Sequence, residues 1–157
     1  MLAVKDRRMP TVQQILSEPR REWVGASPAS ELEIRSLEKA VGTPLPCEYR
    51  DFLCVCNGGE GPLAISPFWF QLFDVNFTLS LVRDDFYRKQ FPGLFFFGSN
   101  GGLESIAFDM RGRSPWPIVA IDCIAGLDSL LVISETFGDF IDAIGRGSTD
   151  DVQRKGV

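Results

Sequence analysis

The chain of 157 residues predicts a single α+β domain: an antiparallel sheet of about five to six strands with helices packed on one face. Three observations predict this fold. Apolar residues recur at helical spacing in the first half, four short β-type runs with hairpin-length connections follow, and one more amphipathic segment comes last. Helices followed by consecutive hairpins favour an antiparallel sheet over a parallel one.

The first helices are predicted from their end signals. Thr11–Glu18 suits a short helix, and Pro19–Pro28 is expected to be a linker. Ser30 opens a clear helix because Glu33, three residues later, completes a capping box, and Gly42 ends it.

A second helix is expected to begin at Pro46, where a missing N–H costs nothing. Its apolar residues recur at i, i+3, i+4 and i+7: Tyr49, Phe52, Leu53 and Cys56. Asn57 and Gly58 predict a left-handed stop. A third helix is expected from Asp74 to about Lys89.

The predicted strands are separated by glycine and proline turns. They are Leu63–Ile65, Phe68–Phe73, Leu94–Phe97, Glu104–Asp109, Ile118–Ile121 and Leu130–Ile133. A final helix is expected after a cap at Ser134. We therefore divide the chain into an N-terminal extension with a short helix (1–29), a domain (30–145) and a flexible tail (146–157).

The composition argues against several functions. There is no histidine, which removes the commonest general base and nearly all catalytic zinc sites. From Glu31 to Ile144, sixteen acidic and eight basic side chains give a net charge of −8. An acidic body disfavours direct nucleic-acid binding and suits a basic protein partner. Neither a membrane span nor a secretory signal is visible, so a cytoplasmic protein with reduced cysteines is expected.

The carboxylates do not predict a catalytic pair. Asp84 and Asp85 are adjacent on a helix and diverge, while Glu104 and Asp109 are five residues apart on a strand and face opposite sides. Asp122 and Asp128 bracket one loop and suit a turn-forming role better than a cation site. We therefore expect no catalytic residue, metal or cofactor.

Partner contact is the remaining use for exposed aromatic and acidic side chains. Trp69 alternates with its phenylalanine neighbours, and Trp116 begins a strand between two prolines. Both are candidate anchors, although core packing is an alternative for each. The partner-binding candidates are Trp69, Asp84, Asp85, Trp116, Glu60 and Asp109.

Two sequence blocks resemble the signatures of the SUKH superfamily, the Smi/Knr type of cell-wall assembly regulators and bacterial immunity proteins. The first is LPCEYRDFLCVCNGGEG, from Leu45 to Gly61, and the second is FFFGSNGGLESIAFDMR, from Phe95 to Arg111. The ending SETFGDFIDAI is similar to the closing helix of the family. Leu103 stands where relatives often have a third glycine. The residues that carry the resemblance and are expected to determine the fold include Pro46, Tyr49, Asn57, Gly58, Gly98, Gly101, Gly102 and Phe108.

The resemblance implies a non-catalytic protein-binding module. Many bacterial members are immunity proteins that block a toxin, often a nuclease with a basic cleft, by direct contact. A general scaffold or regulatory protein of the same fold is the alternative. A third hypothesis is a small-ligand-binding protein or enzyme that uses Asp109, Glu104 and Tyr49 beside the glycine turn. The sequence does not predict the oligomeric state.

Overall fold

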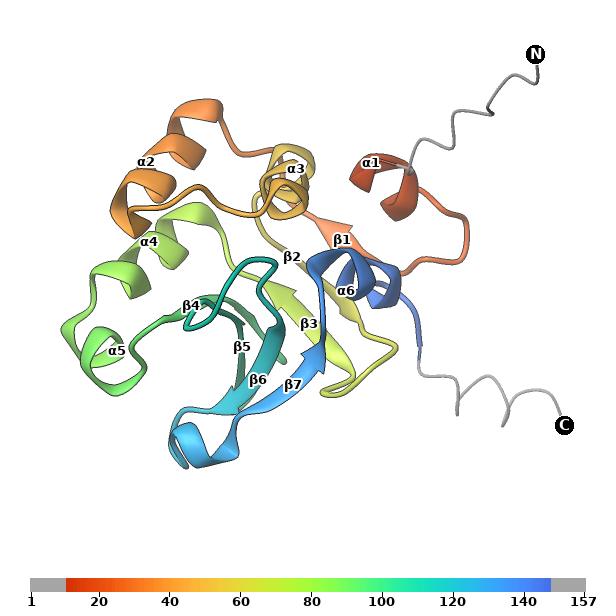
Figure 1. The fold of residues 1–157 in the computed structure, drawn as a ribbon. Helices are drawn as coiled ribbons and strands as arrows, with labels where there is room; N and C mark the ends of the chain where they lie inside the picture. Colours follow the sequence, from red (N-terminus) through yellow and green to blue (C-terminus); the bar gives the residue numbers. More distant parts are fainter. Residues whose placement is uncertain (1–10, 148–157) are drawn as a thin grey trace, which may run out of the picture.

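The computed structural model describes residues 11–147 (Figure 1). Its centre is one seven-stranded antiparallel sheet in which the strands follow each other in chain order. The strands are β1 (Val24–Gly25), β2 (Gly59–Pro62), β3 (Trp69–Leu72), β4 (Leu94–Ser99), β5 (Glu104–Asp109), β6 (Ile118–Asp122) and β7 (Leu131–Ser134). The bulk of the expected flexible tail, residues 148–157, lies outside the described residues.

Six helices accompany this sheet in the described chain. They are α1 (Val12–Leu16), α2 (Glu31–Val41), α3 (Cys47–Val55), α4 (Val75–Arg83), α5 (Asp85–Gln90) and α6 (Phe137–Ala143), and a 3₁₀ turn, η1, spans Leu127–Ser129. The predicted α+β fold with an antiparallel sheet is confirmed. The predicted number of five to six strands is too low. The sheet has seven strands, and the sequence did not predict β1 and β2.

The two missed strands have compositions typical of turns. β1 contains only Val-Gly, and β2 is Gly-Glu-Gly-Pro. The expected strand Leu63–Ile65 is wrong, because in this region only Leu63 pairs, through an isolated bridge with Ile144. The β ladder begins four residues earlier, at Gly59, where backbone pairing with β1 and β3 overrides the poor β propensity of glycine.

The helix ends explain most of the remaining differences. The capping box of Ser30 and Glu33 is confirmed on α2, and Gly42 ends this helix in the left-handed conformation. The single helix expected from Asp74 to Lys89 is wrong, because Asp84 ends α4 in an extended conformation and caps α5 through the N–H of Tyr87 (3.2 Å). The cap of α6 is Thr136 rather than Ser134.

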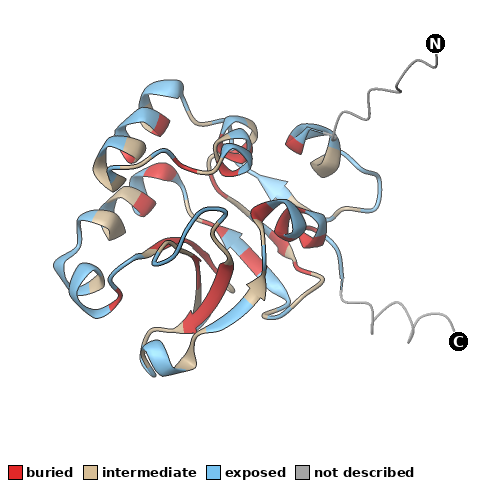
Figure 2. Ribbon diagram, viewed as in Figure 1, coloured by how far each residue is buried: buried red, intermediate tan, exposed pale blue. Residues whose placement is uncertain are grey.

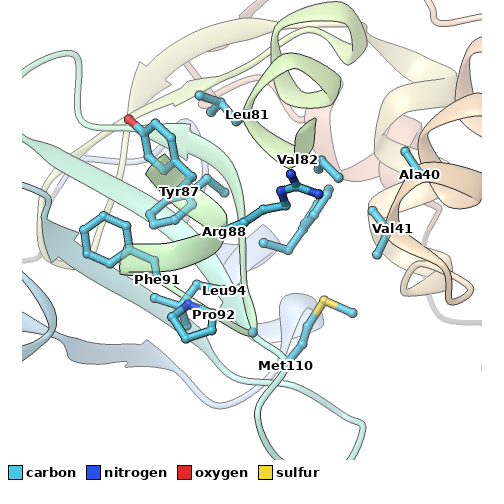
Figure 3. A pocket seen from close by; sticks show the side chains of 13 residues that line it. Ala40, Val41, Leu81, Val82, Tyr87, Arg88, Phe91, Pro92, Leu94 and Met110 are labelled. Atoms are coloured by element: carbon cyan, nitrogen blue, oxygen red, sulfur yellow. The ribbon is translucent and has the colours of Figure 1, made fainter. Parts of the chain in front are cut away.

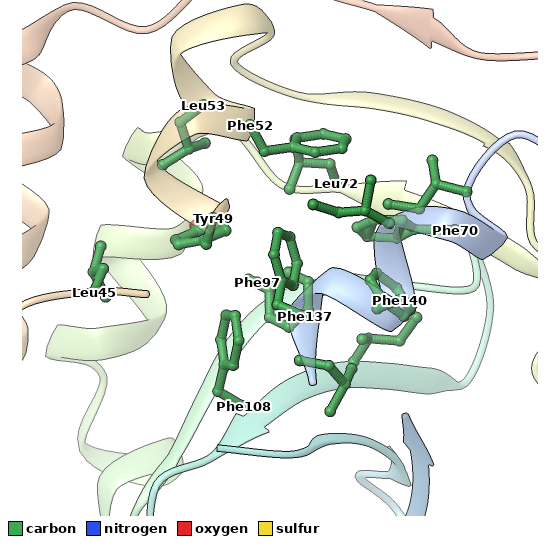
Figure 4. Packing of buried hydrophobic residues seen from close by; sticks show 14 of the residues in the cluster. Leu45, Tyr49, Phe52, Leu53, Phe70, Leu72, Phe97, Phe108, Phe137 and Phe140 are labelled. Carbon is green, nitrogen blue, oxygen red and sulfur yellow. The ribbon is translucent and has the colours of Figure 1, made fainter. Parts of the chain in front are cut away.

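The main core lies between the helices and one face of the sheet (Figures 2 and 4). Tyr49 on α3 contacts four phenylalanine rings with centroids 5.5–5.9 Å away: Phe95, Phe97, Phe108 and Phe137. Such pairs add about 0.5–1.5 kcal/mol each beyond the burial of apolar area. The core therefore joins α3 and α6 to β4 and β5.

A smaller cluster packs on the opposite face of the sheet. It consists of Phe91, Phe96, Ala107, Val119 and Ile121. Tyr87 of α5 packs against this cluster, with its ring 5.2 Å from that of Phe96. The break at Asp84 therefore lets α5 turn away from α4 and cover part of the second face.

The segment before α2 is tightly attached to the rest of the domain. The ring of Trp23 lies 5.6 Å from Phe52 and 5.7 Å from Phe70. The buried guanidinium of Arg21 donates to the carbonyl oxygens at the C-terminal end of α6, those of Ile141 (3.0 Å), Asp142 (3.2 Å) and Ile144 (2.7 Å). The carbonyl of Ile141 also accepts the backbone N–H of Ile144 at 3.1 Å. Arg21 therefore supplements the end of α6 as a cap from a distant part of the chain.

Candidate binding surface

The outward face of β1, β2 and β3 carries polar and apolar side chains in a row. Val24 lies opposite Glu60, Glu60 opposite Gln71, and Gln71 opposite Ser99. Residues directly opposite in antiparallel strands point to the same side, so these side chains share one face. Trp69, two residues before Gln71, is on this face as well and is 39% exposed. We call this row, Val24, Glu60, Trp69 and Gln71, the outer sheet surface.

A hollow of about 690 Å³ lies at the end of this surface, where β1 to β3 meet the start of α4. Its rim carries Glu60, Asp74 and Phe77, the last of which is 48% exposed. The ring of Phe77 is held edge-on by Phe73, with the centroids 4.7 Å apart. An exposed aromatic ring on the same rim as two acids is a suitable anchor for another protein.

Asn57 fixes the wall of this hollow. Its Oδ1 accepts the N–H of Val75 at 2.7 Å, and its Nδ2 donates to Glu33 at 3.5 Å. Asn57 therefore connects the end of α3 to the starts of α2 and α4. The prediction that Asn57 supplies a left-handed stop is wrong; in this pair only Gly58 has positive φ, at 106°. The hydrogen bonds from Ser30 hold the pKa of Glu33 below its ordinary value.

The glycine turn between β4 and β5 supports Trp69. Gly101 has a φ of 78°, and a Cβ atom there would lie 3.6 Å from the Trp69 ring. Asn100 accepts the N–H groups of Gly102 (2.9 Å) and Glu104 (3.2 Å), which closes the turn. The amides of this turn are therefore used internally, as expected for a hairpin rather than for a phosphate cradle.

Asp109 lies at the far end of β5 and is engaged by its neighbour. Arg111 donates to both carboxylate oxygens, from Nε and Nη2 at 2.9 Å each, and its backbone N–H bonds Oδ1 at 3.1 Å. These bonds to Arg111 hold the pKa of Asp109 below its ordinary value. The same pairing raises the pKa of Arg111.

Asp84 and Asp85 lie at the junction of α4 and α5. Asp84 caps α5, while Asp85 pairs with Arg88. Arg88 lies beside an apolar hollow of about 380 Å³ between α2, α4, α5 and β4 (Figure 3). The hollow is lined by α4 and α5 on either side of the break at Asp84, and the continuous helix pattern in the sequence gave no sign of it.

The six candidates do not gather at one site. Glu60 and Trp69 share the outer sheet surface, Asp84 and Asp85 lie at the α4–α5 junction, and Asp109 is at the end of β5. Trp116 is half-buried against the main core and donates its indole N–H to the carbonyl of Gly112 at 3.0 Å. The outer sheet surface therefore contains the most exposed aromatic candidate and one acidic candidate together.

Sequence reasoning missed Val24, Gln71 and Phe77 as surface residues. Alternation along β3 predicts that Gln71 shares the face of Trp69, so this signal was present. Val24 could not be found because β1 was not predicted. Phe77 follows the cap Asp74, and its outward direction depends on where α4 begins.

The structure does not bring together the three side chains of the small-ligand or enzyme hypothesis. Tyr49 is completely buried in the main core, and Glu104 and Asp109 are at opposite ends of β5. Burial raises the pKa of Tyr49 well above its ordinary value and that of Cys56 to about 11, so both stay protonated at neutral pH. Among residues 11–147, no group of three or more histidine, cysteine or acidic side chains is arranged to hold a metal ion. No helix in the same range is long and apolar enough to cross a membrane.

These features define a small α+β domain with a meandering antiparallel sheet, whose motif residues serve turns, caps and the core. Residues 28–143 match the SMI1 / KNR4 family (SUKH-1), and the chain belongs to this family. The match confirms the SUKH superfamily resemblance of the two sequence blocks. A search of curated proteins finds no significant match.

Proposed function

We propose that the protein is a non-catalytic, cytoplasmic protein-binding module that acts as an immunity protein, neutralising a toxin by direct contact. Membership of the SMI1 / KNR4 family supports an immunity or regulatory role. The observation that carries the proposal is a set of exposed side chains on neighbouring elements: Phe77 lines one hollow with the acids Glu60 and Asp74, and Trp69 shares the outer sheet surface with Glu60. Aromatic anchors with charged neighbours are the usual centre of a protein–protein interface.

The charge of the domain indicates the kind of partner. The net charge of −8 between residues 31 and 144 would attract a basic surface and repel nucleic acid. A nuclease toxin has a basic cleft where its substrate binds, and an acidic protein is complementary to it. We therefore propose a basic toxin domain, such as that of a nuclease, as the partner.

The use of polar groups inside the fold supports a role without chemistry. Asn57, Asn100 and Asp109 satisfy backbone or side-chain groups of their own neighbourhood. A catalytic site needs polar groups that converge on a substrate. In this domain Asn57 and Asn100, one from each family block, bond the backbone of their own neighbourhood rather than converging on a substrate site.

The test takes the product of a neighbouring gene as the toxin candidate. We expect a one-to-one complex by isothermal titration and protection of cells that express both proteins. Trp69→Ala and Glu60→Lys should each weaken the complex at least about tenfold, as expected for interface anchors. Leu32→Ala, at an exposed apolar position on α2, is the matched control and should leave the affinity unchanged.

The outcomes separate immunity from a regulatory role. A complex that forms without protecting cells would support a scaffold of the same fold. The absence of both a complex and protection would overturn the proposal. Tight binding that is insensitive to Trp69→Ala and Glu60→Lys would place the contact elsewhere on the domain.

A further inference from the structure

The last strand of the sheet, β7, has an edge that pairs with nothing in the part of the chain that the structure describes. Its inner edge pairs with β6, and no strand follows it in the sheet. Natural proteins usually block such an edge with lysine, proline or a covering segment. Residues 114–145 contain no lysine or arginine, and no proline follows Pro117 in this range. One bulge, at Ile133, leaves Leu131 and Val132 in regular pairing.

Exposed apolar side chains lie on β7 and in the connection that precedes it. Ile124 is 83% exposed, Leu131 65% and Val132 52%, and the side chain of Leu127 is exposed as well. Successive residues of a strand point to opposite faces, so the exposure of both Leu131 and Val132 means that the first half of β7 is uncovered on both faces (Figure 2). Further along, Ile133 packs against the main core. A strand added beside β7 would gain apolar contacts on each face.

Acidic side chains lie at both ends of β7. Asp122 and Asp128 precede it, and Glu135 and Asp139 follow it. Glu104 lies directly opposite Asp122 on β5 and adds to the charge at the first end. A second copy of this chain, paired antiparallel through β7, would bring acids against acids. The charges therefore favour a basic segment over self-association.

We propose that the free edge of β7 is a docking site for an extended, basic segment of the partner protein, which adds to the sheet as an eighth strand. Backbone hydrogen bonds would hold this segment, apolar residues at alternate positions would contact Leu131 or Val132, and lysine or arginine residues would face the acids. The inference rests on the proposed function in one respect: it takes the partner to be a basic protein. The opposite edge, β1, has only two residues and offers a much shorter ladder.

The test uses a synthetic capped peptide of alternating lysine and valine as probe, with an alternating glutamate–valine peptide as its charge control. At low salt, the lysine peptide should slow amide hydrogen exchange by at least tenfold within residues 131–134, measured by NMR. Leu131→Lys and Val132→Lys should abolish this protection, because they place a repelling charge on the edge. Leu32→Lys, at an exposed apolar position on α2, is the matched control and should keep it.

Protection by both peptides, protection elsewhere in the sheet, or no protection would overturn the docking site. Dimerisation through β7, seen by analytical ultracentrifugation and removed by Val132→Lys, would also overturn it in favour of self-pairing. The result is separable from the proposed function. A toxin complex that tolerates Leu131→Lys and Val132→Lys would remove the docking strand and leave the immunity role standing. Failure to find any toxin complex would remove the immunity role. The peptide experiment would still show whether the free edge of β7 accepts an added strand.

Discussion

Tyr49 lies at the centre of the main core, among phenylalanine rings from β4, β5 and α6. Its hydroxyl is buried without a hydrogen-bond partner among the described residues. Thr78 is a neighbour, but its hydroxyl donates to the carbonyl oxygen of Asp74 at 2.8 Å, and no well-directed bond joins it to Tyr49. The ring of Tyr49 therefore contributes to stability, and its oxygen does not.

Tyr49→Phe should leave the free energy of unfolding unchanged or raise it by up to about 1 kcal/mol, because it removes an unpaired buried polar group. Tyr49→Ala should lower it by about 3–5 kcal/mol, the usual cost of deleting a large buried ring. Urea unfolding followed by circular dichroism measures both values. A clear loss of stability in Tyr49→Phe would show that the hydroxyl has a partner.

The pairing of Asp109 with Arg111 predicts how the stability of the domain depends on pH. Its pKa is lowered in the folded state by Arg111, so its contribution to stability is complete above the unfolded pKa of about 3.9. The contribution is lost as the pH falls through the lower folded value. Asp109→Asn should therefore be less stable than the parent at pH 7, and the difference should shrink below about pH 4.

The control for this prediction is Asp51→Asn, at an exposed position on α3. The free energy of unfolding of Asp51→Asn should be close to that of the parent both at pH 7 and below about pH 4. If Asp109→Asn keeps full stability at pH 7, the pairing with Arg111 is not structural, and Asp109 becomes available for partner contact.

At the scale of single elements, α6 depends on a residue far away in the sequence. The helix spans only Phe137–Ala143, and Arg21 satisfies three carbonyl oxygens at its end. Glu18 in turn accepts hydrogen bonds from Arg21 (3.1 Å) and Arg146 (2.8 Å). A helix this short has little stability of its own and relies on such contacts.

Arg21→Met should lower the free energy of unfolding by about 2–3 kcal/mol, because it keeps an unbranched apolar stem but removes the charged hydrogen bonds to the carbonyls at the end of α6. Arg21→Lys should have an intermediate effect, because one ammonium nitrogen can replace part of what Nη1 donates to the carbonyls, while the bonds of Nε and Nη2 to Glu18 are lost. Thermal unfolding measures the order of the three proteins. Equal stability of the Met and Lys variants would show that charge and hydrogen bonding at this position are unimportant.

The elements that sequence predicted correctly have strong local signals. The box of Ser30 and Glu33 specifies the start of α2, and the glycine turn specifies the hairpin of β4 and β5. The missed features depend on tertiary contacts. β2 pairs as a strand because its glycines let Trp23 approach closely: a Cβ at Gly59 would lie 2.6 Å from the indole ring. From the sequence alone, Asp84 cannot be told from an aspartate inside a helix. Its role as the cap of α5 is visible only in the fold.

The candidate surface was only partly predictable for the same reason. Trp69 and Glu60 could be selected as an aromatic and an acid, but their shared face follows from the pairing of β2 with β3. Trp116 was an equally good candidate for an exposed anchor from the sequence, but it is half-buried in the fold. Whether a tryptophan is covered depends on segments distant in the sequence, which alternation alone does not include.

At the scale of the whole molecule, the net negative charge predicts that the association rate with a partner depends on salt. The rate of complex formation with a basic partner should fall by about tenfold or more between low salt and about 0.5 M salt, because screening removes long-range attraction. The dissociation rate should change much less. Stopped-flow measurements separate the two rates. An association rate independent of salt would show that the acidic body does not guide the encounter.

The attachment of the N-terminal segment has a practical consequence for anyone who trims this protein. A fragment limited to the matched family residues, 28–143, would lack the indole of Trp23 and the guanidinium of Arg21. Phe52 and Phe70 would lose an aromatic neighbour, and the main sheet would lose its first strand. We expect that fragment to precipitate or to bind a dye for exposed apolar surface, whereas one covering 11–147 should stay folded. We therefore expect the unit that folds to extend beyond the residues that match the family.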